Sequence, residues 1–230
     1  MFDPGITTAD YMSIIVTHEC NRNCPFCVDS HRGKAEFISM ESVNKAVHFG
    51  ISHSIKDILL VGGEPTLHPE IVKISQTFCS HGFNVILTSN FDDLNKIYEL
   101  DPFVSSFNMS NYGQELPDLS KIKHADLTLS SLIYRHRLGT KKELDEFIDR
   151  FEGSPIHLKF STLTPCNEFA KREQKVDYLD KLPGKRMTLF NEILGQEYRG
   201  CLIKRYDRLL NPAAVQSFKC HPNGTIDQQW

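Results

Sequence analysis

Short apolar runs alternate with amphipathic stretches along most of the chain, and this alternation predicts repeated strand–helix units. The strand-like runs are rich in β-branched and large apolar residues and are bounded by polar, Gly or Pro positions. They lie at 11–17, 57–61, 84–88, 104–109, 126–132 and 156–163. Stretches with helical periodicity follow four of them, at 39–51, 69–79, 91–99 and 141–151.

Strands that alternate with helices are typical of a parallel sheet with right-handed crossovers. We therefore expect an α/β fold, a partial (β/α)6 barrel of parallel strands whose reactive end is formed by the C-terminal ends of the strands. The last 65 residues break the alternation, with a helix expected around 188–194 and an irregular, β-rich tail over 213–227. This predicts a core over 1–165 and a short C-terminal extension over 166–230 that covers the reactive end.

Composition changes this picture little. The 230 residues are 40% hydrophobic and 24% charged, with a net charge of −3 and no block of basic residues, so a nucleic-acid polymer is not a favoured partner. The N-terminus lacks the basic-then-apolar pattern of a signal peptide, and no apolar run approaches the roughly 18 residues of a membrane span. We expect a cytoplasmic protein without a membrane partner.

Three of the seven cysteines, Cys20, Cys24 and Cys27, follow the first strand in a C-x3-C-x2-C run. Seven cysteines without a secretion signal favour metal or redox use over a disulfide framework. Three thiolates leave one iron of a four-iron cluster open to a ligand that is not protein. A structural zinc site is the alternative, with His18 or His31 as fourth ligand, although no second ligand pair occurs at the usual spacing.

The second motif, Gly62-Gly63-Glu64-Pro65, ends the second predicted strand. Its glycines permit unusual dihedral angles and close backbone approach, and its carboxylate and carbonyls are acceptors for a cationic amine. With the cysteine run, this motif resembles the radical SAM superfamily. The resemblance implies that the cysteines bind a [4Fe-4S] cluster and that the GGEP segment holds the methionine amino group of S-adenosylmethionine.

The same resemblance implies the chemistry and further cofactor contacts. An electron from an external donor such as flavodoxin or ferredoxin would cleave the cofactor to a 5′-deoxyadenosyl radical, which abstracts hydrogen from the substrate. Phe26 would shape the adenine pocket, Leu163 would pack on adenine, and Asn90 and Ser110 would contact the ribose or the methionine carboxylate. Polar residues at strand ends also form turns and caps, so Asn90 and Ser110 keep that alternative. The sequence indicates no catalytic side chain beyond these.

Three further cysteines, Cys166, Cys201 and Cys220, lie in the expected extension. Extensions in similar enzymes bind additional iron–sulfur clusters, so these residues are candidates for an auxiliary cluster. A complete extension of that kind would contain more cysteines in closely spaced groups. Ordinary free thiols are the alternative.

The substrate is expected to be a small molecule, nucleoside- or sugar-derived, in a biosynthetic pathway. Only about a dozen residues precede the first predicted strand, so we expect no N-terminal peptide-recognition domain. The alternatives are epimerisation or cross-linking of a peptide, activation of a glycyl-radical enzyme, and a non-catalytic iron–sulfur or zinc module.

Overall fold

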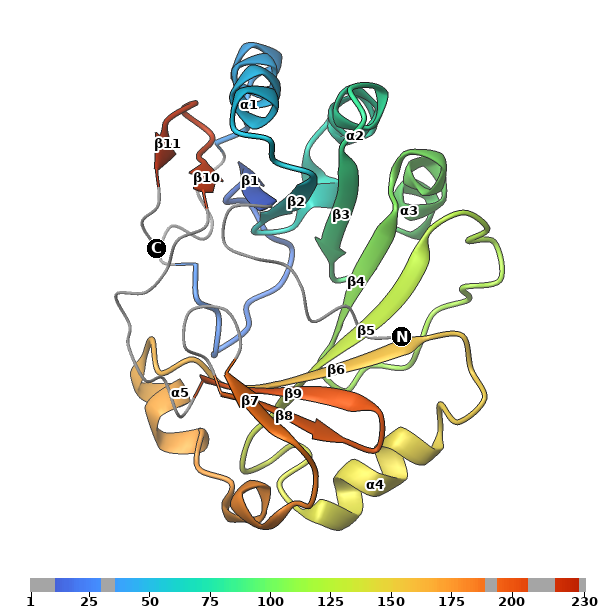
Figure 1. Ribbon diagram of the computed structural model, residues 1–230, viewed down its shortest axis with the longest axis vertical. Coiled ribbons are helices and arrows are strands. Elements are labelled where there is room, and N and C mark those ends of the chain that lie inside the picture. The colour runs from blue at the N-terminus through green and yellow to red at the C-terminus, as the bar shows by residue number, and fades with distance from the viewer. Residues whose placement is uncertain (1–10, 30–35, 189–193, 207–217, 228–230) are drawn as a thin grey trace.

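A computed structural model describes residues 11–29, 36–188, 194–206 and 218–227. Over these ranges, one 11-stranded sheet curves into an incomplete barrel, in the order β11-β10-β1-β2-β3-β4-β5-β6-β9-β8-β7 (Figure 1). The central six strands are all parallel. They are β1 (Tyr11–Thr17), β2 (Asp57–Gly62), β3 (Asn84–Ser89), β4 (Ser106–Asn111), β5 (Asp126–Ile133) and β6 (His157–Thr162).

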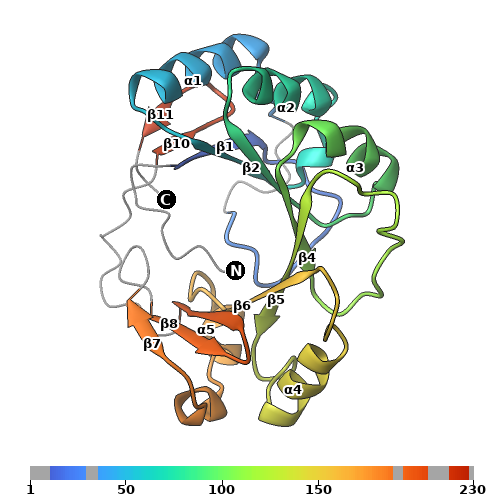
Figure 2. The same ribbon diagram turned by 45° about the vertical axis from the view of Figure 1, so that its right-hand side comes forward.

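Helices cover the outside of this sheet (Figure 2). They are α1 (Met40–Ser52), α2 (Ile71–Ser80), α3 (Leu94–Leu100) and α4 (Lys141–Asp149). Their starts are encoded locally: the Ser39 side chain accepts a hydrogen bond from the Ser42 amide, and Thr140 forms a capping box with Glu143. Short 3-10 helices lie at Pro65–Leu67, Asp101–Phe103 and Asp177–Lys181.

Alternate residues of each strand face the helices or the barrel interior, as the two-residue period of a strand requires. On β1 the fully buried Met12, Ile14 and Val16 belong to the core between sheet and helices, and Ser13 and Thr17 point the other way. On β6 the Phe160 ring packs at 5.7 Å on Phe147 of α4. The interior face is consequently the more polar one.

The structure confirms the expected fold class, with each of the six strands and four helices within a few residues of its predicted range. The helix expected around 188–194 is not found: its ends belong to β7 (Arg186–Thr188) and β8 (Leu194–Tyr198), in which Thr188 pairs with Leu194. Residues 189–193 lie outside the described ranges. The expected β-rich tail contains β10 (Phe218–Cys220) and β11 (Ile226–Asp227), and residues 213–217 of it are also outside them.

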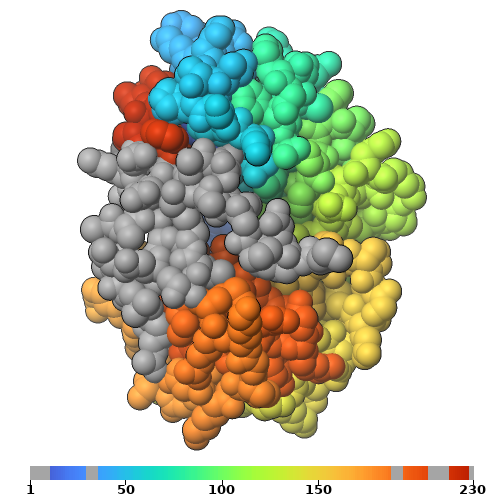
Figure 3. Space-filling model, viewed as in Figure 1, coloured from blue at the N-terminus to red at the C-terminus, as the bar shows by residue number. Residues whose placement is uncertain are grey.

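The residues after 165 continue the sheet at both of its edges. After α5 (Glu168–Glu173), the strand β9 (Cys201–Arg205) pairs in parallel with β6, and β10 pairs in parallel with β1. Figure 3 shows the two parts on opposite sides of one face, β7 to β9 in orange and β10–β11 in red beside α1. The boundary expected at 165 thus separates two parts of one sheet. Across the described residues, no helix has the length and apolar character needed to cross a membrane.

Candidate active site

The loop after β1 that carries Cys20, Cys24 and Cys27, the cysteine loop, is joined to the end of β2 by close backbone contacts. The Gly63 amide donates to the Thr17 carbonyl and the Glu64 amide to the Glu19 carbonyl, each at 2.7 Å. A Cβ atom on Gly62 would lie 2.2 Å from the Thr17 oxygen, and one on Gly63 would lie 2.1 Å from the Glu19 oxygen. Gly62 also has a φ of +152°. Both glycines are needed because no larger residue permits this approach.

The three thiols are carried on a tight, half-buried loop. The Cys27 amide donates to the Cys24 carbonyl at 3.2 Å, and the Arg22 amide donates to the Cys20 sulfur at 3.4 Å. All seven cysteines lie in described ranges, and none forms a disulfide. A backbone amide directed at a sulfur stabilises a thiolate, the form that binds metals. The donor set therefore fits a cluster with three protein ligands.

A single metal ion requires its ligands to converge on one point. In the ranges that the structure describes, no three His, Cys, Asp or Glu side chains meet this condition. An iron–sulfur cluster is less demanding, because each cysteine binds a different iron. The His18 ring contacts the Asp29 carboxylate, with 2.9 Å between Nδ1 and Oδ2, and His31 lies outside the described residues.

The Glu64 carboxylate points into the fold and is only 2% exposed. It accepts hydrogen bonds from the Thr66 amide at 3.1 Å and hydroxyl at 2.8 Å, from the Ser89 hydroxyl at 2.7 Å and from the Asn90 amide at 2.8 Å. Burial raises the pKa of Glu64, and these four hydrogen bonds oppose that rise. This carboxylate thus holds the end of β3, and its expected hydrogen bond to a cofactor amine stays a prediction.

A network of polar side chains ties the cysteine loop to the segment after β3. The Asn90 side chain donates from its Nδ2 to Oδ1 of Asn21 at 2.7 Å, and its Oδ1 accepts from the Asp92 backbone amide at 2.9 Å. The Arg22 guanidinium contacts both Asp92 oxygens, at 2.9 Å from Nε to Oδ2, and donates to the Asn90 carbonyl at 3.2 Å. The Asp92 carboxylate raises the pKa of Arg22. Sequence reasoning missed Arg22 and Asp92, because no local pattern connects residues so far apart.

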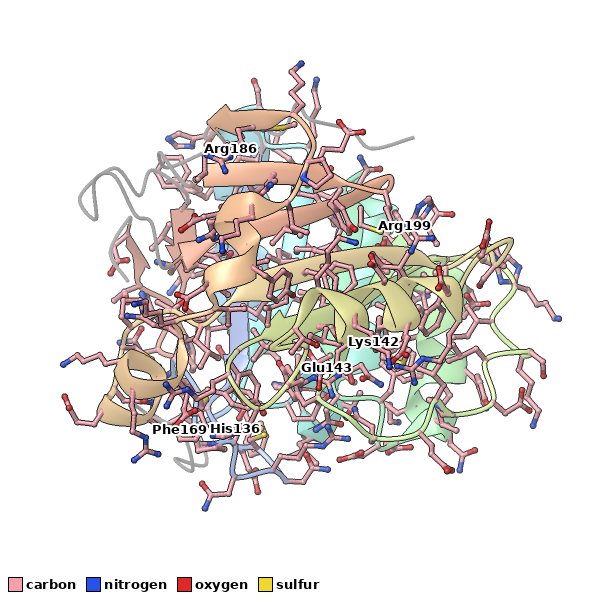
Figure 4. All side chains as sticks on the ribbon, turned by 90° about the horizontal axis from the view of Figure 1, so that it is seen from below. His136, Lys142, Glu143, Phe169, Arg186 and Arg199 are labelled. Atoms are coloured by element: carbon pink, nitrogen blue, oxygen red, sulfur yellow. The ribbon has the colours of Figure 1, made fainter. Side chains whose placement is uncertain are left out.

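Aromatic side chains from three other segments surround Phe26. Its ring lies 4.8 Å from that of Tyr112 after β4, 6.0 Å from Tyr134 after β5 and 6.4 Å from Phe169 on α5. Figure 4 shows Phe169 and His136 at the same corner of the molecule. There His136 Nε2 lies 3.3 Å from the Glu173 carboxylate, which links the loop after β5 to α5.

The other residues expected to contact cofactor lie at the same end of the barrel as the cysteine loop. Ser110 is half-buried on β4, and its hydroxyl forms a hydrogen bond with Tyr112. Leu163 follows β6 directly and is 2% exposed. Asn90 follows β3 and is 7% exposed. The structure brings their segments together, and their contact with a cofactor stays a prediction.

The three cysteines of the extension do not converge. The Cys166 sulfur lies against the cysteine loop, 3.7 Å from the Cys27 carbonyl oxygen, and the neighbouring Asn167 donates to the Pro25 carbonyl at 3.0 Å. Cys201 begins β9 beside the start of β6, about 13 Å of strand away from the end that Cys166 follows. Cys220 lies at the opposite edge, paired with Ile14 of β1. Strand register thus separates residues that the sequence grouped.

Comparisons with known proteins agree with this geometry. The family model of the radical SAM superfamily matches residues 14–110, which include both motifs. A GTP 3′,8-cyclase of Mannheimia succiniciproducens is 24% identical over 93% of this chain and 67% of its own length. A GTP 3′,8-cyclase of Campylobacter jejuni is 22% identical over 95% of this chain and 72% of its own length. A putative glycyl-radical enzyme activating enzyme of Methanocaldococcus jannaschii is 24% identical over 55% and 47%.

Among solved structures, SuiB of Streptococcus suis bound to S-adenosylmethionine has a TM-score of 0.63 at 12% identity, over 95% of this chain and 60% of that one. SuiB bound to the precursor peptide SuiA has a TM-score of 0.63 at 11% identity, over 95% and 59%. At these identities, the likeness shows a shared fold. The chain spans about three fifths of the SuiB chains that it matches.

Proposed function

Because this chain is an enzyme of the radical SAM superfamily, we propose that it cleaves S-adenosylmethionine reductively at a [4Fe-4S] cluster held by Cys20, Cys24 and Cys27. When bound, this cofactor pair supplies a radical that abstracts hydrogen from an unactivated carbon of the substrate. The observation that carries the proposal is the pair of 2.7 Å backbone bonds that set the Gly62-Gly63 turn directly against the cysteine loop.

The protein's own contribution is to place the groups and hold them. The Gly62-Gly63 turn presents backbone to the cofactor's amino group, and buried Glu64 fixes the end of β3 beside it. The Arg22–Asp92 pair and the rings around Phe26 hold the cysteine loop from two further sides. Such fixed placement matters because a reactive radical must meet the intended hydrogen before any other.

We further propose that the substrate is a small molecule derived from a nucleotide. The support is that GTP 3′,8-cyclases align over 93% to 95% of this chain. An external protein such as flavodoxin or ferredoxin would donate the electron. An auxiliary cluster is not part of the proposal, because Cys166, Cys201 and Cys220 lie apart.

The test is the formation of 5′-deoxyadenosine by the anaerobically reconstituted protein, with dithionite as reductant and S-adenosylmethionine as the only added cofactor. We expect the wild-type chain to bind about four irons and to form the product slowly. Cys24→Ala should lose both properties. Cys79→Ala is the matched control, because Cys79 is exposed on α2 and outside the loop. Cofactor cleavage by the Cys24→Ala variant would contradict the proposal.

A further inference from the structure

Two lysines lie on the inner wall of the barrel, on neighbouring strands. Phe160 of β6 faces α4, so the adjacent Lys159 points to the opposite, interior face. Lys204 of β9 is the register partner of Ser161, two positions after Lys159, and therefore faces the same interior. Register thus makes the two amines diagonal neighbours.

These two positive charges have no counter-charge among the described residues. Both side chains are half-buried, and no ion pair or hydrogen bond between described residues involves either one. Burial and repulsion by Lys204 lower the pKa of Lys159 to about 7, and burial lowers that of Lys204. The acidic Glu197 shares the interior face on β8 but is exposed and pairs with neither lysine.

A third interior lysine shows the ordinary arrangement. Lys219 of β10 faces Asp227, its register partner on β11. Burial lowers the pKa of Lys219 to about 8, and the Asp227 carboxylate opposes this shift. Lys159 and Lys204 lack such a partner within the described ranges. Holding two unpaired cations close together is unfavourable, and an anion placed between them would relieve both the desolvation and the repulsion.

One row of the wall beside the lysines is polar and uncharged apart from Lys159 itself. Register places Lys159, Ser130 and Ser110 in one row across β6, β5 and β4. Neighbouring strands are about 4.8 Å apart, so Lys159 and Ser110 originate about 10 Å from each other. Register thus places Lys159 two strands away from the strand that carries the expected cofactor contact.

We propose that Lys159 and Lys204 form an anion-binding subsite that anchors a phosphate or carboxylate group of the substrate inside the barrel. This inference rests on the proposed function, because it assigns the anion to the substrate of that same site. The anchored group would orient the substrate's reacting carbon toward the cofactor end of the barrel.

The test is calorimetric titration of the anaerobically reconstituted protein with inorganic phosphate and, separately, with succinate. We expect at least one of the two anions to bind, and which one binds tells a phosphate from a carboxylate substrate. Lys159→Met and Lys204→Met should each weaken that binding at least tenfold, whereas Lys159→Arg should retain most of it. Lys142→Met is the control, because Lys142 lies on α4 outside the barrel (Figure 4).

Circular dichroism verifies folding, and Lys159→Gln replaces Lys159→Met if the latter does not fold. The proposal is overturned if the wild type binds neither anion or if the lysine variants bind as tightly as the wild type. It is also overturned if saturating S-adenosylmethionine displaces the anion, because the subsite would then hold the cofactor's own carboxylate. Anion binding needs no cofactor cleavage, so a protein that binds phosphate without forming 5′-deoxyadenosine would fail only the proposed function.

Discussion

At the scale of single residues, Glu64 shows that a motif residue can act from inside the fold. Its carboxylate accepts four hydrogen bonds from Thr66, Ser89 and Asn90 and is almost fully buried. This side chain thus holds the backbone that, in our proposal, lies beside the cofactor.

Replacing Glu64 with Ala leaves the Ser89 hydroxyl and the Asn90 amide without their acceptor. We expect a loss of about 2–3 kcal/mol in the free energy of unfolding, retained iron, and S-adenosylmethionine binding weakened about tenfold because the end of β3 shifts. Urea unfolding, iron analysis and equilibrium binding measure these effects. Glu70→Ala is the control, because Glu70 is an exposed residue paired with Lys73. Unchanged cofactor affinity would show that Glu64 plays no positioning role.

Gly63 is the second residue for which we expect a clear effect of substitution. In Gly63→Ala, the new Cβ would lie 2.1 Å from the Glu19 oxygen, so the cysteine loop must move. We expect iron incorporation to fall by about half or more, measured per folded chain. Gly82→Ala is the control: Gly82 has a φ of +82°, and nothing lies within 4 Å of the new atom. Equal iron contents in the two variants would mean that the close approach to Glu19 does not limit this position.

At the scale of elements, strands and helices are determined largely by local pattern, whereas the contacts between loops are not. The apolar run of β1 and the N-cap of α1 can be recognised in the sequence because both depend on neighbouring residues. The Arg22–Asp92 pair, 70 positions apart, arises only when β1 and β3 lie in one sheet. Pattern also predicted a helix at 188–194, where Thr188 and Leu194 belong to a hairpin; short strands carry too few residues to show their period.

The Arg22–Asp92 pair joins the cysteine loop to the segment after β3. It is partly shielded from solvent, with side chains 22% and 40% exposed. A double-mutant cycle with Arg22→Ala and Asp92→Ala should give a coupling free energy of about 0.5–1 kcal/mol in urea unfolding, because solvent screens the pair only in part. The same cycle on Lys45 and Glu41, whose side chains are 62% and 78% exposed, should give a smaller coupling because solvent screens that pair more fully. Equal couplings would remove the special role of the Arg22 contact.

At the scale of the whole molecule, a barrel that closes only partly keeps charged residues on its inner wall. Lys159, with a pKa near 7, is protonated in the unfolded chain over a range in which it is neutral in the fold. Between about pH 7 and pH 10, the unfolded state therefore binds more protons, and stability should rise with pH. Below pH 7 both states are charged, and the full cost of burying the charge persists.

Lys159→Met removes that cost, so we expect it to raise the free energy of unfolding more at pH 6 than at pH 9. Lys204 and the exposed Glu197 face the same space and stay unchanged in the variant. Denaturant unfolding at the two pH values, without added phosphate, measures the difference. A stabilisation that is equal at both pH values would place the Lys159 pKa far above 7. Lys142→Met, on α4, should show no pH-dependent change.

The amino-acid sequence by itself determined the strand–helix core and the two motifs of the reactive end. Strand periodicity, helix caps and the spacing of Cys20, Cys24 and Cys27 are properties of neighbouring residues, so they can be recognised without knowledge of the tertiary structure. Only the tertiary structure decided that Glu64 points inward, that Cys166 lies beside Cys27 while Cys201 and Cys220 lie elsewhere, and that Lys159 and Lys204 share one wall. The physical reason is strand register: which residues meet depends on how distant segments pair and pack, and a one-residue shift turns a side chain to the other face.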